Sequence, residues 1–334
     1  MIRKNFVLAV LLCSPILVML LVFGRSGETA TGVTLKLAHG LSAEHPVHRG
    51  MVHMSERLFT LSGGSMRTDI YLNGQLGSER ELLEMLQIGA LAMTKVSAIS
   101  LEGFSADMKL FSIPYIFEDS AHYWRVLNGE IGTRMLDSIR KVRLQGLGYY
   151  DAGSRSFYMT DSAVKTPADL ESKKVRVLPS RTSIEMVESL GAAATPISWG
   201  ELYTALQQGV VDGAENNPPS YYLSKHYETA RYYTLDEHTS VPDVLIMSRE
   251  IYDGLTMQQR TWLQQAVAES IVLQRALWVT AEKTALEAVQ AAGVEIIYPD
   301  KQLFRDAVLD LQATFAQSPL GPVIRQVKAL EADE

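Results

Sequence analysis

Strand-like and helical patterns alternate along this chain, and their order constrains the fold more than any single motif. An alternating segment, Val33–Ala38, is followed by a helical pattern that ends at Gly63 and Gly64 and by a second strand-like segment that turns at Asn73 and Gly74. An amphipathic helical pattern, SERELLEMLQIGA, and a short apolar segment, LAMTKVSA, come next. This βαβα order predicts a sheet covered by helices.

The same order returns after Gly146. The segment LQGLGYYDAGSRSFYMT is strand-like, Thr166 and Pro167 are typical of the start of a short helix, and residues 174–178 have a strand pattern. A long helical region at residues 257–292 then precedes the segment VEIIYP and a last helix. Two α/β units with a late return of the chain predict a two-lobed molecule with a cleft between the lobes.

The expected lobes are not continuous in sequence. We predict that residues 33–152 and 241–281 form the first lobe, that residues 153–240 and 282–334 form the second, and that the long helix crosses both. The chain has 334 residues, 47% of them hydrophobic, which suffices for two separate cores. Its formal net charge of -7 comes from acids and bases mixed along the chain, and no basic run predicts a nucleic-acid groove.

The first 30 residues differ in character from the rest. Arg3 and Lys4 precede an apolar run at residues 6–23, and a polar stretch, GRSGETATG, follows. A positive start, an apolar centre and small residues afterwards predict an export signal, cleaved near Ala30. The run is also close to the ~18 residues that a membrane-spanning helix needs, so an uncleaved anchor is the alternative.

Cys13, the only cysteine, lies within this apolar run. After cleavage, the mature chain would contain neither a disulfide nor a thiolate metal site. An exported chain without cysteine fits the bacterial periplasm, which is the location we expect.

Seven histidines raise the question of a metal site. Four of them lie in the segment HGLSAEHPVHRGMVH, but none of their spacings gives the histidine pair with a glutamate that HExxH zinc sites use. We therefore expect no metal and interpret the segment as a helix start with solvated histidines. His39 is the exception, because it ends the first strand, where the residues of a cleft emerge.

Sequence signatures of common catalytic sites are missing. No serine lies in a G-x-S-x-G motif, and neither a P-loop nor a GxGxxG motif occurs. Glu215 and Asp212 could form an acid–base pair, but no partner nucleophile can be identified. We predict a protein that is not an enzyme and needs no cofactor. An exported enzyme that uses Glu215 as its base is the alternative.

Two arginines are flanked by apolar strand residues. Arg176 lies within KVRVLPS and Arg155 within AGSRSFY. A guanidinium beside buried apolar residues needs an anion, because an unpaired buried charge is costly, and its planar fork matches a carboxylate. A structural ion pair with Asp or Glu is the alternative for each. Two such arginines in one α/β unit favour an acidic ligand.

The segment VDGAENNPPSYYLSKHYE carries two adjacent amides, Asn216 and Asn217. Amides both donate and accept hydrogen bonds, which suits the hydroxyl groups of a ligand better than proton transfer. Pro218 and Pro219 stiffen the backbone behind them, and the nearby tyrosines and Trp199 offer flat faces to a sugar-like ring. A polar turn without a ligand is the alternative.

Five motifs together resemble one family. NGQLGSERELLEMLQIGAL, FSIPYIF, KTPADLESKKVRV, WGELYTALQQGVVDGAEN and HYE occur in the order found in the extracytoplasmic solute-binding proteins of TRAP transporters, the DctP-type family. The resemblance covers residues 33–315. It implies an α/β, two-lobed periplasmic binding protein fold, with two mixed-sheet domains around a ligand cleft. It also implies capture of an organic acid and delivery to a membrane permease of a small and a large subunit.

The resemblance also implies roles for single residues. Arg176 would pair with the ligand carboxylate, Arg155 would assist it, Trp199 would line the cleft and Asn216 would contact the ligand. The other candidate ligand-binding residues are Asn217, His39, Lys95, Ser97 and Glu79. One position departs from the family pattern: the usual aspartate of a G-x-L-D segment is Ala92 here, and we interpret that position as structural.

The segments ENNPPS, HYE and LDEHTSVPDVL resemble the branch of this family associated with sugar acids, particularly uronates such as glucuronate and galacturonate. A C4-dicarboxylate or a 2-oxoacid remains an alternative ligand, since binders of these acids share the arginine. An anchored sensor and a binding protein of an ATP-driven importer remain alternative roles. No interface signal is present, and we expect a monomer.

Overall fold

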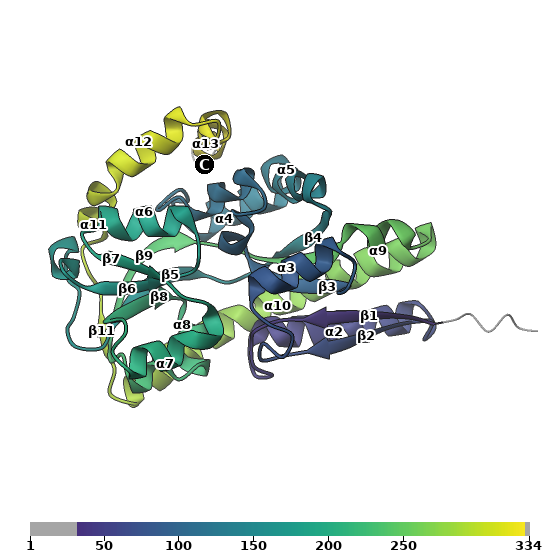
Figure 1. The fold of residues 1–334 in the computed structure, drawn as a ribbon, viewed down its shortest axis with the longest axis horizontal. Coiled ribbons are helices and arrows are strands. Elements are labelled where there is room, and N and C mark those ends of the chain that lie inside the picture. Colours follow the sequence, from purple (N-terminus) through teal and green to yellow (C-terminus); the bar gives the residue numbers. More distant parts are fainter. Residues whose placement is uncertain (1–31, 331–334) are drawn as a thin grey trace, which may run out of the picture.

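The computed structural model describes residues 32–330 and contains two β-sheets, each flanked by helices (Figure 1). The α/β class and the mixed sheets that the sequence predicts are confirmed. The predicted export segment, residues 1–30, lies outside the described residues. Across residues 32–330, no helix is both long and apolar enough to cross a membrane.

The first sheet has five strands in the order β2-β1-β3-β10-β4. β1 pairs in parallel with β2 and β3, whereas β10, which comes from much later in the chain, pairs antiparallel with β3 and β4. The strands are β1 (Val33–Ala38), β2 (Met66–Tyr71), β3 (Met93–Ser97), β4 (Leu144–Tyr150) and β10 (Asp243–Ser248). The helices of this part are α2 (Pro46–Leu61), α3 (Glu79–Gln87), α4 (Ser120–Asn128), α5 (Glu130–Ser138) and α9 (Arg249–Gly254).

The second sheet has six strands in the order β11-β9-β5-β8-β6-β7. β6 is parallel to β7 and β8, and β5 is antiparallel to β8 and β9. The strands are β5 (Ser154–Met159), β6 (Lys174–Val177), β7 (Ala193–Pro196), β8 (Gly213–Asn216), β9 (Tyr232–Ser240) and β11 (Glu295–Ile297). The helices of this part include α6 (Arg181–Ser189), α7 (Leu202–Gln207), α8 (Pro218–Leu223) and α11 (Lys301–Ala307).

One long helix, α10 (Met257–Ala291), runs along both halves of the molecule (Figure 1). It packs against α2 and β4 at the first sheet and against α8 beside the second sheet. Its start is fixed by Thr256, whose side chain caps the helix together with Gln259. Buried residues recur at helical spacing along one side, which is why a single helix serves two cores.

The chain passes directly from a strand of one sheet to a strand of the other after β4 and after β9, in addition to the passage through α10. At the first crossing, the buried side chain of Gln274 on α10 bonds both backbone groups of Asp151, each at 2.8 Å. At the same crossing, Gly153 has a φ of 57°, and a Cβ there would lie 2.9 Å from Nε1 of Trp278. A side chain at this position would be strained by both its backbone angle and its neighbour. The crossing is therefore held tightly against α10.

The end of the chain differs from the sequence expectation. In place of one last helix there are three, α11, α12 (Leu309–Gln317) and α13 (Gly321–Ala329). Buried side chains of α13 belong to the same core as Tyr123 and Trp124 of α4, so this helix packs on the first-sheet side. Figure 1 shows α13 beside α4, with α12 leading up to it from the second sheet. The predicted lobe boundaries remain a prediction.

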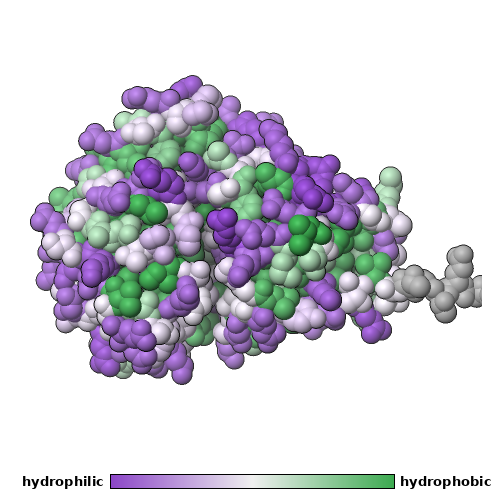
Figure 2. Space-filling model, in the orientation of Figure 1, coloured by the Kyte–Doolittle hydropathy of each residue, from purple (hydrophilic) through white to green (hydrophobic). Residues whose placement is uncertain are grey.

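Most apolar side chains are buried in clusters that belong mainly to one sheet or the other. The face drawn in Figure 2 is largely hydrophilic, with small hydrophobic patches between polar side chains. The buried apolar residues form four clusters, two of them built mainly on the first sheet and two on the second. Each sheet therefore has cores of its own.

Gln274→Ala tests the attachment of the first crossing to α10. The change removes two hydrogen bonds and leaves both partly buried backbone groups of Asp151 without their partner. We expect a loss of about 1–3 kcal/mol in the free energy of unfolding, measured by chemical denaturation. Gln265→Ala, an exposed glutamine on the same helix, is the control. An equal, small effect of both changes would contradict this role of Gln274.

Candidate functional site

Arg176 lies on β6, which pairs with β8 and with the edge strand β7 of the second sheet. Its neighbours Val175 and Val177 point into an apolar core, and alternation along the strand turns Arg176 to the other face. Its Nε donates to the carbonyl oxygen of Ile197 at 2.8 Å, but Nη1 and Nη2 have no partner among the described residues, although the side chain is fully buried. Burial lowers the pKa of Arg176 to about 10, so the group is charged at neutral pH.

Arg155 on β5 is paired within the chain. Its Nε and Nη2 donate to the carboxylate of Glu215 on the adjacent strand β8, and its Nη1 donates to Oδ1 of Asn216 at 3.0 Å. The structural ion pair that the sequence left open for this arginine is therefore present. Burial opposes ionisation of Glu215, but the charges and hydrogen bonds of Arg155 and His238 together outweigh it and lower the pKa of Glu215 to about 2. A carboxylate so paired is a weak base, which disfavours the enzyme alternative.

Two further buried groups, Asp236 and His238, extend this pair. Nδ1 of His238 lies 2.8 Å from Oδ2 of Asp236, and its Nε2 lies 3.5 Å from Oε2 of Glu215. Burial opposes the charge of His238, yet the two carboxylates raise its pKa to about 9. Neither residue was predicted from the sequence as part of the site. Their spacing of two along a strand is the signal that could have placed them on one face.

The two asparagines use their oxygens within the protein. Oδ1 of Asn216 accepts from Arg155 and from the backbone of Asn217, while Oδ1 of Asn217 accepts from the backbone of Ser220 and caps α8. Neither side-chain NH2 group makes a hydrogen bond among the described residues, although both side chains are buried. Two amide donors thus remain open at the end of β8.

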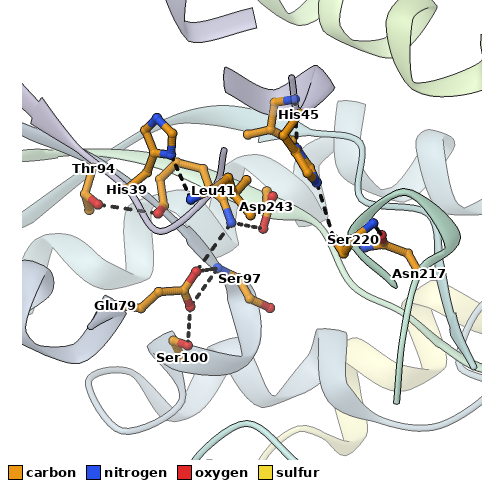
Figure 3. A network of polar contacts seen from close by, with 12 residues as sticks. His39, Leu41, His45, Glu79, Thr94, Ser97, Ser100, Asn217, Ser220 and Asp243 are labelled. Atoms are coloured by element: carbon orange, nitrogen blue, oxygen red, sulfur yellow. Dashed lines mark hydrogen bonds and ion pairs between the residues drawn. The ribbon is translucent and has the colours of Figure 1, made fainter. Parts of the chain in front are cut away.

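Four predicted site residues meet at the first sheet (Figure 3). The carboxylate of Glu79, at the start of α3, accepts from the backbone of Ser97 at 3.1 and 3.2 Å, from Oγ of Ser100 at 2.6 Å and from Nζ of Lys95 at 3.4 Å. Lys95 also pairs with Asp243 of β10 at 3.0 Å. Burial raises the pKa of Asp243 although Lys95 opposes this shift.

The fourth residue of that group is His39, at the end of β1. Its Nδ1 accepts from the backbone of Leu41 at 3.1 Å, so Nε2 carries the proton and faces Nδ1 of His48 at 3.0 Å. Burial, helped by the charge of Lys95, lowers the pKa of His39 to about 3. His39 is therefore neutral and offers no charge to a ligand.

The expectation of solvated histidines is wrong for His45. The side chain is buried, and its Nδ1 accepts from the backbone of Val47 to cap α2. Its Nε2 therefore carries the proton and donates to Oγ of Ser220 on α8 at 3.3 Å (Figure 3). This bond joins a helix of the first sheet to a helix of the second. A sequence pattern could not show it, because the partners are 175 positions apart.

Trp199 lies in a short helical turn, Trp199–Glu201, and is partly buried. A Cβ at Gly40, after β1, would lie 3.4 Å from its ring, so the indole reaches across to the first sheet. Its ring centroid is 5.2 Å from that of His226, whose Nδ1 lies 2.9 Å from the hydroxyl of Tyr158. Burial lowers the pKa of His226 to about 3, with the nearby charge of Arg176 adding to the shift.

The predicted residues come from both sheets, and one common site for all of them remains a prediction. Arg176, Arg155, the two asparagines and Trp199 come from the second sheet, and His39, Lys95, Ser97 and Glu79 come from the first. The charges of Glu215 and Glu79 both raise the pKa of Arg176, although burial outweighs them. The described residues contain no group of three or more His, Cys, Asp or Glu side chains that could hold a metal ion.

The stability contributed by His238 depends on its proton. Its pKa is raised from 6.5 to about 9 by folding, so this contribution is complete below pH 6.5 and is lost as the pH rises through about 9. We expect the difference in melting temperature between the wild type and His238→Asn to narrow over that range. His53→Asn, on the surface side of α2, is the control. A difference that stays constant with pH would refute the assignment.

The chain is similar to proteins of one known family. Residues 37–318 match the family described as bacterial extracellular solute-binding protein, family 7 (DctP). The uncharacterized protein YiiZ of Salmonella typhimurium is 38% identical over 288 residues, which cover 86% of each chain.

Two of the similar solved structures match this chain over nearly its whole length. A TRAP periplasmic solute binding protein from Xanthobacter autotrophicus Py2 with bound beta-D-galacturonate has a TM-score of 0.86 and 36% identity, covering 88% of this chain and 99% of that chain. One from Pseudomonas putida F1 with bound D-glucuronate has a TM-score of 0.86 and 33% identity, covering 90% and 98%.

Proposed function

The chain belongs to family 7 of the bacterial extracellular solute-binding proteins, and from this membership we propose that it captures a sugar acid for a TRAP permease. The proposed ligand is a uronate such as galacturonate or glucuronate, which the two similar structures contain. The family binds solutes for transport, which agrees with the sequence prediction of a non-enzymatic role.

One observation carries the proposal, namely the buried guanidinium of Arg176 with two open donors. An unpaired charge in a dry interior is costly, and a carboxylate would remove that cost. Nη1 and Nη2 present two parallel N–H groups, which match the two oxygens of a carboxylate. Among polar ligands, an organic acid therefore gains most from this site.

The surrounding groups suit the hydroxyls of a sugar acid. The open amides of Asn216 and Asn217 donate hydrogen bonds, while the carboxylates of Glu79 and Asp243 accept them. Trp199 offers a flat face to the ring. In this proposal Arg155 orients the side chain of Asn216 by donating to its Oδ1, and Asn216 contacts the ligand.

Hydrogen bonds between the two halves suggest how ligand binding affects the relative position of the halves. Besides the bond from His45 to Ser220, the backbone of Thr182 on α6 donates to Glu102 at 3.4 Å, which again joins the two sheets. We propose that a ligand between the predicted lobes stabilises this arrangement. The ligand shifts the equilibrium toward this arrangement only by the difference between its affinity for this form and its affinity for a more open form. A permease could then recognise the loaded protein by its shape.

We also propose that the protein acts in the periplasm together with a membrane permease. Residues 1–30 would direct export to the periplasm with cleavage near Ala30, and the protein would deliver its ligand as a monomer to the small and large permease subunits. Retention of the segment would anchor the protein in the membrane and favour the sensor alternative. The mass of the exported protein separates the two.

Arg176→Ala tests the proposal. Galacturonate at about 100 times its dissociation constant should stabilise the wild type by roughly 2.7 kcal/mol, seen as a rise in melting temperature. In Arg176→Ala we expect this rise to disappear and the binding free energy, measured by calorimetry, to fall by about 2–5 kcal/mol. The ligand-free variant loses the unpaired charge but also the bond from Nε to Ile197, so its own melting temperature without ligand is the baseline for the shift.

Arg181→Ala, an exposed arginine five positions along the chain, is the matched control and should bind galacturonate as the wild type does. Neutral galactose should not stabilise either protein. Unchanged affinity of Arg176→Ala for galacturonate, or equal stabilisation by galactose, would contradict the proposed function.

A further inference from the structure

The loop that connects β1 to α2 carries contacts from the first half of the molecule to the second. This joining loop consists of residues 39–45 and continues into the first turn of α2. A Cβ at Gly40 would lie 3.4 Å from the ring of Trp199, and Nε2 of His45 donates to Oγ of Ser220 at 3.3 Å (Figure 3). Both contacts therefore depend on the position of the joining loop.

A pair of histidines ties the two ends of the joining loop together. Nε2 of His39, at its start, lies 3.0 Å from Nδ1 of His48 in the first turn of α2. The backbone N–H of Leu41 donates to Nδ1 of His39 at 3.1 Å. Because a backbone N–H can only donate, Nε2 of His39 carries the ring proton and Nδ1 of His48 accepts it. The neutral pair thus satisfies both hydrogen bonds.

This pair has no place for a further proton. Protonation of His48 would put an N–H on its Nδ1, opposite the N–H of His39 at 3.0 Å. If His39 instead carried its proton on Nδ1, that proton would face the N–H of Leu41 at 3.1 Å. A donor opposes a donor in either arrangement, so one of the two hydrogen bonds must break.

We infer that His48 is a positioning residue whose neutral form holds the joining loop in place for ligand binding and whose protonation releases the loop. The inference rests on the proposed function and goes beyond it, since His48 is not among the predicted ligand-binding residues. Release of the loop weakens the contacts of Gly40 and His45 with the second half. The arrangement that the ligand stabilises then becomes less favourable, so the affinity for the ligand falls in acid.

His48 is the member of the pair that solvent can protonate. It is partly exposed, whereas His39 and His45 are buried. Burial, helped by the charge of Lys95, lowers the pKa of His39 and of His45, which keeps both rings neutral. Burial also lowers the pKa of His48 below its ordinary 6.5, although the charge of Glu44 in the joining loop opposes this shift.

A surface hollow beside His48 contains the other groups that face it from α2 and α10. Helix α10 contributes Leu273 and Leu277, which carry no charge. The charged or titratable side chains that line the hollow come from α2 and are Arg49, His53 and Glu56. His53, a second histidine in the same hollow, therefore provides a matched control.

The charge state of His48 sets the direction of the pH dependence. Since the intact pair favours the neutral ring, its contribution is complete above pH 6.5 and is lost as the pH falls below that value. Carboxylates of sugar acids remain ionised above about pH 5, so the charge of galacturonate does not change in this range. The expected loss of affinity therefore follows protonation of the protein and not of the ligand.

Calorimetry with galacturonate at pH 7.5 and pH 5.5 tests the inference in the wild type, His48→Asn and His53→Asn. The amide oxygen that His48→Asn introduces can accept from His39 but does not titrate. We expect the affinity to fall at least about fivefold between the two pH values in the wild type and in His53→Asn, and at most about twofold in His48→Asn. Glu282, whose pKa burial raises to about 7, is common to all three proteins.

A second measurement needs no ligand. Nitrogen-15 NMR of the imidazole rings distinguishes the two neutral tautomers from each other and from the protonated ring. We expect the proton of His39 on Nε2 at pH 7.5, and a change in the His39 signals at pH 5.5 in the wild type but not in His48→Asn. A proton on Nδ1 of His39 at pH 7.5, or the same change in both proteins, would overturn the inference.

The outcomes separate this inference from the proposed function. Failure of galacturonate and of other organic acids to bind at pH 7.5 would refute the proposed function. Binding at pH 7.5 with a fall in affinity in the wild type that is no larger than in His48→Asn would refute the role of His48 and leave acid binding intact.

Discussion

Between residues 32 and 330, Arg176 has the one buried guanidinium without a carboxylate partner, and the other groups of the proposed site are interpreted from it. The chain contains enough carboxylates nearby to neutralise it, but each is committed elsewhere. Glu215 is bound by Arg155 and faces His238, while Glu79 and Asp243 share Lys95. These pairings leave the two outer nitrogens of Arg176 free. A buried charge without a partner costs stability, and that cost is what a bound carboxylate would recover.

The architecture places this charge where two sheets meet. β6 presents Arg176 from one side, and the ends of β1 and β3 present His39 and Ser97 from the other. The long helix α10 packs on both halves, and Gln274 fixes the crossing between them. The hydrogen bond from His45 to Ser220 joins the halves beside the site. In the proposed function, a ligand bound between the halves would stabilise the same relative position that these contacts hold.

Local patterns allowed most of the fold to be predicted from the sequence. The first strand and the long helix lie where periodicity placed them, and the apolar flanks of Arg176 correctly indicated a buried guanidinium. Partners distant in sequence could not be predicted. Whether Arg155 would meet Glu215 or a ligand depends on strand pairing, and β9 has an irregular register near Glu237, whose φ is 52°. The burial of His45 and the packing of α13 likewise arise from tertiary contacts that no local pattern encodes.

The most direct test of the central claim is a crystal structure of the mature protein with galacturonate. The account predicts both carboxylate oxygens about 2.7–2.9 Å from Nη1 and Nη2 of Arg176, with the ring hydroxyls directed to Asn216, Asn217 and Glu79. A complex in which the carboxylate lies elsewhere, and Arg176 meets a hydroxyl group or water, would contradict it.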